Sequence, residues 1–162
     1  MIRFDVSALL KAHLGQSLTL NIDTGPQALG ELKVDYLRGT VRVFRIQNGL
    51  YVEGTVQTQL RLECVRCLEP FAFPTALELD ETFRLSEADP RFDIPYAVGD
   101  DGWLDLAPLL REQAWLAIPM KPLCRIDCKG LCPQCGADLN REVCTCERVQ
   151  IDPRLAVLKE LL

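Results

Sequence analysis

The sequence of 162 residues is poor in aromatic residues, which make up 7%, and it contains a single histidine, His13. No apolar run approaches the about 20 residues that a transmembrane helix needs. We expect no secretory signal at the N-terminus, because Arg3 and Asp5 interrupt the first apolar residues. A nucleotide-binding glycine fingerprint, a P-loop and a nucleophile elbow are also missing. We therefore expect a cytoplasmic protein with no membrane segment and no small-molecule substrate.

The sequence also lacks an excess of positive charge. It has 18 Lys and Arg against 23 Asp and Glu, a formal net charge of −5. This balance disfavours a protein that coats nucleic acid by bulk electrostatics, although local basic surfaces remain possible. Six acidic residues and one arginine between Ser86 and Asp105 account for the whole imbalance. We predict that residues 86–102, which contain two prolines and two glycines, form a solvated loop.

The first half of the chain has the period-two alternation of β-strands. Residues 17–23 predict a half-buried strand, and a second strand is expected over 34–46. The apolar phase of this second strand changes after Val43, which predicts a bulge or a strand covered on both faces. Asn48-Gly49 predicts a tight type I′ hairpin turn, because these residues tolerate positive φ values.

The clearest alternation covers residues 52–62, which lead directly into Cys64 and Cys67. Alternation resumes over 71–85, so the first cysteine pair is expected at the turn between two long antiparallel strands. An apolar stripe predicts a helix over 105–118.

The expected fold class is α+β. It combines a curved antiparallel β-sheet or partial barrel, one packed amphipathic helix and a C-terminal zinc-ribbon-like segment. The β-rich part covers residues 1–122, the cysteine-rich zinc-binding segment covers 123–148 and a C-terminal helix covers 149–162. We expect these parts to form one compact unit.

The eight cysteines carry the most specific chemical signal. Pairs at C-x-x-C spacing bind metal because a tight turn lets both sulfurs converge while backbone N–H groups point at them. Gly136 after the second pair can supply the positive φ that such a turn needs. Eight thiolates divide naturally into two zinc sites, which gives two Zn²⁺ per chain. The predicted ligands are Cys64, Cys67, Cys124, Cys128, Cys132, Cys135, Cys144 and Cys146.

Two divisions of these ligands are open. Close spacing favours a local C-x2-C-x8-C-x-C site from Cys132 to Cys146, with the other four cysteines forming a second site. That second ion would clip the β half to the C-terminal segment across a long loop. In the alternative, Cys64 and Cys67 pair with Cys132 and Cys135.

Three other interpretations compete with zinc. Disulfides are disfavoured in a reducing compartment. Residues 128–135 match the C-x3-C-x2-C spacing that holds an iron–sulfur cluster in radical S-adenosylmethionine enzymes, but a (β/α) barrel pattern is missing. A redox thiol switch is the third alternative, because C-x-x-C thiols can have a lowered pKa.

We expect no enzyme. Catalytic zinc sites keep a position open for water and rarely use four thiolates. His13 is far in sequence from the cysteines, and the acidic residues show no acid/base pair.

The sequence resembles the YceD family, the large ribosomal RNA subunit accumulation proteins, in four motifs that occur in the same order. They are LECVRCLEPF at 62–71, WLDL at 103–106, PMKPLC at 119–124 and CKGLCPQCGADLN at 128–140. The resemblance implies a bacterial protein that supports accumulation or assembly of large-subunit ribosomal RNA. It implies no catalytic residue.

We therefore expect a non-catalytic zinc-binding factor whose partner is large-subunit ribosomal RNA or a pre-ribosomal particle. The alternative is a redox- or zinc-responsive protein-interaction module. An RNA binder should group its cations near the cysteine turns. The candidate RNA-binding residues are Arg61, Arg66, Lys121, Arg125 and Lys129.

Overall fold

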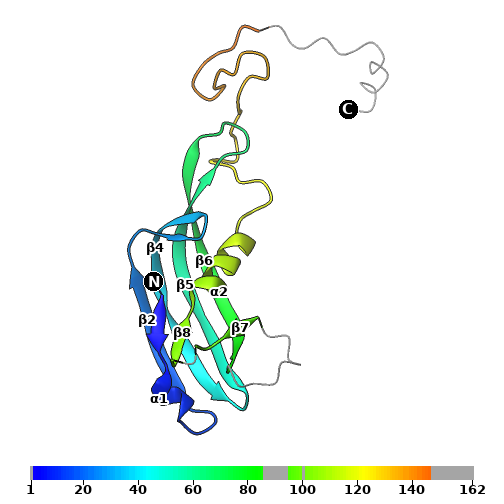
Figure 1. Ribbon diagram of the computed structural model, residues 1–162. Coiled ribbons are helices and arrows are strands. Elements are labelled where there is room, and N and C mark those ends of the chain that lie inside the picture. Colours follow the sequence, from blue (N-terminus) through cyan, green and yellow to red (C-terminus); the bar gives the residue numbers. More distant parts are fainter. Residues whose placement is uncertain (1, 86–94, 100, 147–162) are drawn as a thin grey trace, which may run out of the picture.

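The computed structural model describes residues 2–85, 95–99 and 101–146. Its main feature is an open six-stranded sheet with the order β2-β4-β5-β6-β7, in which β3 also pairs with β4 (Figure 1). A second sheet pairs β1 with β8. The strands are β1 (Arg3–Asp5), β2 (Ser17–Thr24), β3 (Gln27–Leu29), β4 (Leu32–Ile46), β5 (Gly49–Glu63), β6 (Pro70–Arg84), β7 (Tyr96–Ala97) and β8 (Trp103–Asp105). The helices are α1 (Ser7–Leu10) and α2 (Ala107–Leu116).

The length of the three central strands gives the molecule its elongated shape. β4, β5 and β6 each have 15 residues and form an antiparallel meander. The last β4–β5 pair is Val34 with Leu60, whereas β5 and β6 stay paired as far as Glu63 and Pro70. The β5–β6 hairpin therefore extends beyond the rest of the sheet and carries the first cysteine pair to one end of the molecule (Figure 1).

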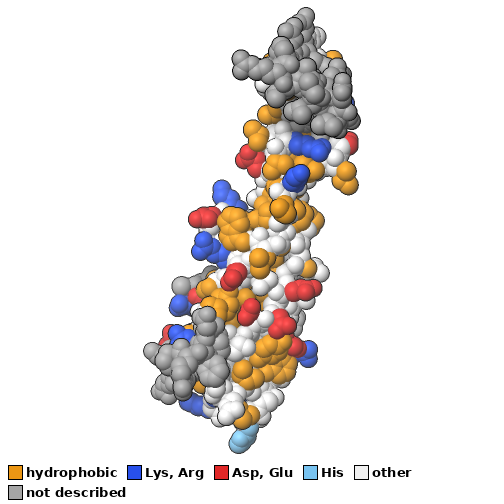
Figure 2. All heavy atoms as spheres, turned by 90° about the vertical axis from the view of Figure 1, so that its right-hand side faces the viewer, with side chains coloured by type: hydrophobic (Ala, Val, Ile, Leu, Met, Phe, Trp, Pro, Cys, Tyr) orange, Lys and Arg blue, Asp and Glu red, His pale blue; other side chains and the backbone are white. Residues whose placement is uncertain are grey.

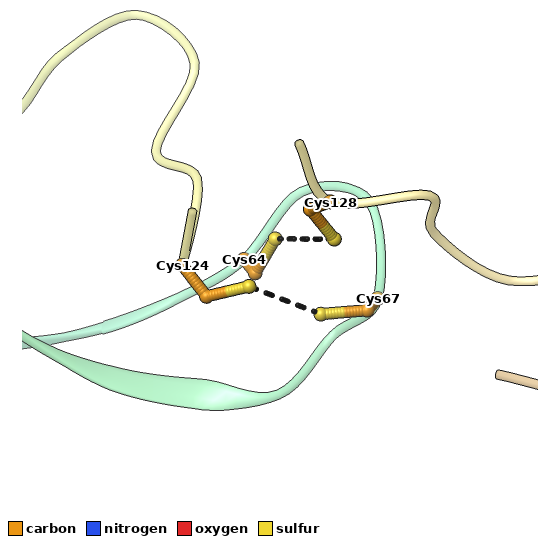
Figure 3. Close-up of side chains that lie close together, drawn as sticks. All are labelled: Cys64, Cys67, Cys124 and Cys128. Atoms are coloured by element: carbon orange, nitrogen blue, oxygen red, sulfur yellow. Dashed lines mark hydrogen bonds between the residues drawn. The ribbon is translucent and has the colours of Figure 1, made fainter. Parts of the chain in front are cut away.

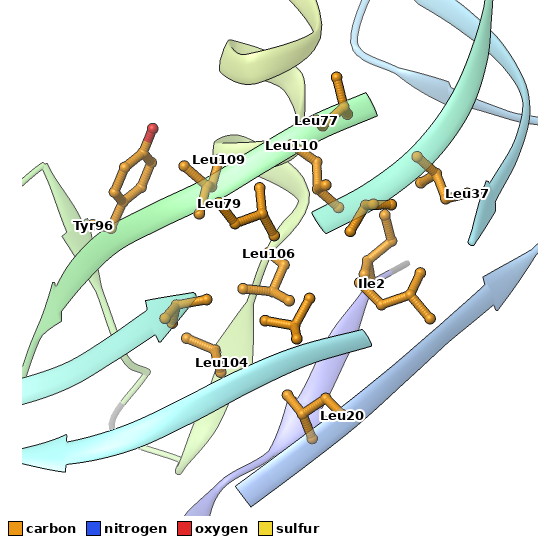
Figure 4. Close-up of a cluster of buried hydrophobic side chains, with 14 of the residues drawn as sticks. Ile2, Leu20, Leu37, Leu77, Leu79, Tyr96, Leu104, Leu106, Leu109 and Leu110 are labelled. Carbon is orange, nitrogen blue, oxygen red and sulfur yellow. The ribbon is translucent and has the colours of Figure 1, made fainter. Parts of the chain in front are cut away.

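One face of the sheet carries the core. Val52, Val56 and Leu60 of β5 are fully buried, while residues between them on the other face are exposed or half-buried. Leu109 and Leu110 of α2 are fully buried and pack over this face (Figure 4). Just before α2, the Asp105 Oδ1 accepts a hydrogen bond of 3.0 Å from the Ala107 N–H, an Asx turn that leads into the helix. The α+β class is thus confirmed, with a sheet that does not close into a barrel.

Three local predictions need correction. Asn48-Gly49 lies at the predicted hairpin, but neither residue has a positive φ. Gly49 is instead the first paired residue of β5, where a Cβ would lie 2.1 Å from the Phe83 carbonyl oxygen. The register shift of β4 falls between Val34 and Leu37, not after Val43.

The third correction concerns the predicted loop over residues 86–102. Residues 96 and 97 form β7, which pairs in parallel with the end of β6. Tyr96 stacks on Phe83, with 5.1 Å between ring centroids, and its hydroxyl donates a hydrogen bond to Glu112 of α2. Burial and this carboxylate raise the pKa of Tyr96, so it stays a neutral donor. The remainder of the loop, at 86–94 and 100, and the predicted helix at 149–162 lie outside the described residues.

No helix in the described ranges is long and apolar enough to cross a membrane.

The close approach of β4 and β5 at Gly39 yields a stability prediction. A Cβ at Gly39 would lie 2.2 Å from the Thr55 carbonyl oxygen and 2.8 Å from the Val56 Cα, both backbone atoms that cannot move aside freely. Gly39→Ala should therefore lower the free energy of unfolding by about 1–3 kcal/mol in urea denaturation. Gly25→Ala is the matched control, because nothing lies within 4 Å of its added methyl group. Equal stability of the two variants would contradict this packing.

Candidate metal centres

The eight cysteines gather into two groups of four. Within each group the sulfur atoms lie within 4.8 Å of one another, and all eight cysteines are free thiols. The first tetrad contains Cys64, Cys67, Cys124 and Cys128. The second tetrad contains Cys132, Cys135, Cys144 and Cys146. This grouping agrees with the division favoured by local spacing and excludes the alternative, in which the two C-x-x-C pairs share one ion.

The first tetrad joins two distant parts of the chain. Cys64 and Cys67 lie in the turn between β5 and β6, and Cys124 and Cys128 approach this turn from the segment after α2 (Figure 3). The turn is closed by a hydrogen bond of 2.9 Å from the Leu68 N–H to the Cys64 carbonyl, and Leu68 has a φ of 61°. The Val65 N–H also donates to the Pro122 carbonyl over 3.0 Å, which fixes the two segments side by side.

The second tetrad is local. Its turn is closed by a hydrogen bond of 2.9 Å from the Gly136 N–H to the Cys132 carbonyl. Gly136 has a φ of 74°, as the sequence predicts for the residue after this C-x-x-C pair.

The sulfur spacing fits a tetrahedral ion. Metal–sulfur bonds of about 2.3 Å place the sulfurs of a regular tetrahedron about 3.8 Å apart. In the first tetrad the Cys64–Cys128 and Cys67–Cys124 sulfur distances are 3.9 and 3.7 Å. In the second tetrad the Cys135–Cys144 and Cys132–Cys144 distances are 3.6 and 3.3 Å, so its sulfurs lie slightly closer together than in a regular tetrahedron. Both groups can hold a metal ion, and each offers it four sulfur ligands.

In each tetrad, hydrogen bonds from the backbone favour the thiolate form of one cysteine. Hydrogen bonds from backbone N–H groups, first that of Cys124, lower the pKa of the Cys64 thiol to about 6. The N–H groups of Cys135 and Gln134 do the same for Cys132, whose pKa also falls to about 6. Burial raises the pKa of Cys124 to about 12. In each tetrad the backbone thus favours the thiolate form of one cysteine, the form that binds a metal ion, and metal binding would release the proton of a thiol such as Cys124.

The two tetrads differ in their surroundings. Cys64, Cys67 and Cys128 are buried and form a small apolar cluster with Phe71 and Leu123, separate from the main core. In the second tetrad Cys132 is buried but Cys135 is exposed. Solvent therefore reaches the second tetrad more easily than the first.

The structure also bears on the iron–sulfur interpretation and on His13. Cys128 belongs to the first tetrad, whereas Cys132 and Cys135 belong to the second, so the three cysteines of the C-x3-C-x2-C spacing do not converge on one cluster. His13 is exposed at the end of the molecule opposite the cysteines (Figure 2). It therefore contributes to neither tetrad.

Three of the five candidate RNA-binding residues are engaged within the protein. Arg61 forms an ion pair of 2.8 Å with Asp35. Arg66 donates over 2.8 Å to the Cys128 carbonyl, and so ties one cysteine turn to the other. Arg125 donates over 2.8 Å to the Asn140 Oδ1.

The other two candidates, Lys121 and Lys129, are exposed, and within the described ranges neither forms an ion pair. The surface around the tetrads carries basic, acidic and apolar side chains together (Figure 2). The cations available for RNA near the tetrads are thus fewer than the five predicted from the sequence, because the three arginines have partners within the protein.

Sequence reasoning gave no role to Asn140, although it lies in the last of the four motifs. Its Oδ1 accepts hydrogen bonds from the Lys129 N–H and from Arg125, and its amide nitrogen lies 3.5 Å from the Cys128 sulfur. An asparagine between cysteines is usually a turn residue, and only the three-dimensional contact distinguishes it.

Comparison with known proteins identifies the family. The family model described as large ribosomal RNA subunit accumulation protein YceD matches residues 52–162. An uncharacterized protein of Mycobacterium tuberculosis is 36% identical over 127 residues, which cover 75% of this chain and 60% of the relative. The uncharacterized protein YlbN of Bacillus subtilis is 31% identical over 109 residues, covering 67% of this chain and 63% of the relative.

A plant relative carries a functional name. The large ribosomal RNA subunit accumulation protein YCED homolog 1, chloroplastic, of Arabidopsis thaliana is 28% identical over 155 residues, which cover 73% of this chain and 47% of the relative. The chain thus spans about half to two thirds of the length of these relatives, and no solved structure matches it. On the family match and these identities, the chain belongs to the YceD family of large ribosomal RNA subunit accumulation proteins.

Proposed function

We propose that this protein is a non-catalytic, cytoplasmic zinc-binding factor that supports accumulation of large-subunit ribosomal RNA by binding ribosomal RNA within an assembling particle. The observation that carries the proposal is the pair of closed four-sulfur tetrads in a chain of the YceD family. A site with four thiolates leaves no position for a water nucleophile, so its ion acts as a structural element. The role in ribosomal RNA accumulation rests on the family description and on the name of the plant relative.

Zinc is the ion that suits these ligands best. It accepts tetrahedral thiolate sets without a redox change. The first tetrad would hold the β5–β6 turn against the segment after α2. The second would hold the turn at Cys132 and Cys135 in a zinc-ribbon-like arrangement.

Two exposed lysines favour RNA as the partner, since neither forms an ion pair within the part of the chain that the structure describes. Lys121 and Lys129 lie on the exposed side of the segment that carries Cys124 and Cys128, beside the first tetrad. Ammonium groups that have no carboxylate partner can neutralise backbone phosphates. Arg66 and Arg125 are less suited to this role, because the protein already uses them to connect its cysteine turns.

One observation favours a second candidate function. Cys135 is exposed, so an oxidant can reach the second tetrad. This supports the alternative of a redox- or zinc-responsive interaction module, in which loss of zinc alters a protein-binding surface.

The zinc stoichiometry is the first test. We expect elemental analysis of protein purified without added metal to give two zinc ions per chain. Acidification should release them, because thiolate ligands must be deprotonated to bind metal. A chain with one zinc, or with iron and visible absorbance, would contradict the two-site proposal.

The tetrads should contribute unequally to stability. Cys64→Ser removes a cross-link over a loop of 57 to 64 residues, which a chain-entropy model values at about 4 kcal/mol, or about 10 °C in Tm. Cys144→Ser removes only a local site and should change the thermal unfolding of the sheet much less. When a chelator removes zinc, wild type and both variants should have similar Tm values. An equal loss of Tm in the two variants would refute this assignment of roles.

A charge-reversal experiment tests the function itself. The test uses a strain from which the gene for this protein is deleted. The Lys121→Glu/Lys129→Glu variant should lose salt-dependent co-sedimentation with precursor large subunits from this strain, and should fail to restore its ribosomal RNA levels. Lys11→Glu/Lys33→Glu changes the same charge at exposed positions outside the two segments that carry the cysteines and should behave as wild type. If the first variant behaves as wild type, these lysines do not make the contact, and a protein partner becomes the better hypothesis. If wild type itself does not co-sediment, the proposed function is wrong.

A further inference from the structure

Asn140 lies in the chain segment of the second tetrad, but its side chain contacts the first tetrad. It lies between Cys135 and Cys144, in the loop that the second tetrad closes. Its side-chain nitrogen nevertheless lies 3.5 Å from the sulfur of Cys128, a member of the first tetrad. The same amide therefore connects the two groups of cysteines.

The orientation of this amide is fixed by its other partners. Two N–H donors, the Lys129 backbone and the Arg125 guanidinium, each approach the Asn140 Oδ1 to 2.8 Å. An atom that receives two donors must be the carbonyl oxygen. The amide nitrogen then faces the Cys128 sulfur and the Asp138 Oδ1, which lies 2.7 Å away. Both partners are acceptors, so Asn140 donates one hydrogen to each.

The loop that carries Asn140 is docked on the first tetrad by further bonds. The Leu139 N–H donates over 2.9 Å to the Gly130 carbonyl. Arg141 forms an ion pair of 2.9 Å with Glu69, which closely follows Cys67 in the first turn. Asp138 Oδ1 also accepts the Asn140 backbone N–H over 2.9 Å, which holds the residue in place within its own loop.

We infer that the two metal sites are coupled and that Asn140 is the positioning residue that couples them. An ion in the second tetrad orders the loop from Cys135 to Cys144, and so holds the Asn140 amide against Cys128. An N–H donor to a metal-bound thiolate disperses its charge, and such outer partners commonly change metal affinity by about 10–100-fold. Filling the second site thus tightens the first, and the reverse holds by the same factor. This inference rests on the zinc binding proposed above, but not on the role in ribosomal RNA accumulation.

The chemistry of Asn140 allows a direct test by metal competition. The protein is loaded with cadmium, which takes the place of zinc and gives one NMR resonance per site, and each site is then titrated with a chelator. Asn140→Ala should weaken the first site about 10–100-fold while both tetrads keep all their sulfurs. Asn140→Asp should weaken it too, because it keeps the oxygen that Lys129 and Arg125 contact but removes the donor to Cys128. Cys135→Ser/Cys146→Ser, which abolishes the second site, should weaken the first site to a similar extent.

A double-mutant cycle separates coupling from general damage. Adding Asn140→Ala to Cys135→Ser/Cys146→Ser should cause little further weakening of the first site, because the coupling is already lost. Gln134→Ala, an exposed change within the second turn, is the control and should leave the first site at wild-type affinity. Unchanged first-site affinity in Asn140→Ala, or fully additive effects, would overturn the coupling while leaving the zinc proposal intact. If neither tetrad binds metal, the zinc proposal and the coupling both fail.

Discussion

The cysteine end of the molecule depends on the convergence of four sulfurs from segments 57 to 64 residues apart. Beyond the last β4–β5 pair the β5–β6 hairpin has no sheet on its β4 side, and the segment after α2 has no strand or helix in the described residues. Their shared apolar cluster is small and consists mainly of the cysteines themselves, with Phe71 and Leu123 beside them. Hydrophobic burial on this scale cannot offset the entropy of ordering two loops. An ion bound by all four sulfurs, as proposed above, would supply the stability that so small an apolar cluster cannot.

The same constraint determines the role of the nearby arginines. Four thiolates around a divalent cation leave a net charge of −2, and a charge of that size needs nearby donors and cations. Arg66 meets this need by donating to the Cys128 carbonyl. Arg125 meets it by donating to Asn140, whose amide nitrogen lies against the Cys128 sulfur. A guanidinium held in this way is part of the support of the metal site. For this reason an RNA contact is better sought at Lys121 and Lys129 than at the arginines that the sequence also suggests.

The parts of the structure that the sequence predicts well are those governed by local rules. Alternation locates β2 and β5, spacing groups the cysteines, and the apolar stripe locates α2. Where prediction fails, the cause is a partner distant in the chain. Gly49 is adjacent to Asn48 in sequence, but its role is to let the Phe83 backbone approach, which no turn rule reveals. Tyr96 lies within an acidic, proline-containing stretch, but it stacks on Phe83 and forms part of β7. The contact of Asn140 with Cys128 likewise depends on how two separately predicted cysteine sites dock.

The difference in loop length between the tetrads also suggests an order of assembly. Loop-closure entropy grows with the logarithm of loop length, so closing the first tetrad, over 57 to 64 residues, costs about 1.5 kcal/mol more than closing the second, over 9 to 12 residues. The second site can therefore form while the first is still open, and its ordered loop then presents Asn140 to the incoming Cys128. Once closed, the first tetrad keeps three of its cysteines buried, namely Cys64, Cys67 and Cys128, whereas Cys135 and Cys146 of the second stay exposed. The site that forms more readily is thus also the one that an oxidant or a chelator reaches first. Loss of its ion would act on the buried site through Asn140 before any reagent touched the buried sulfurs.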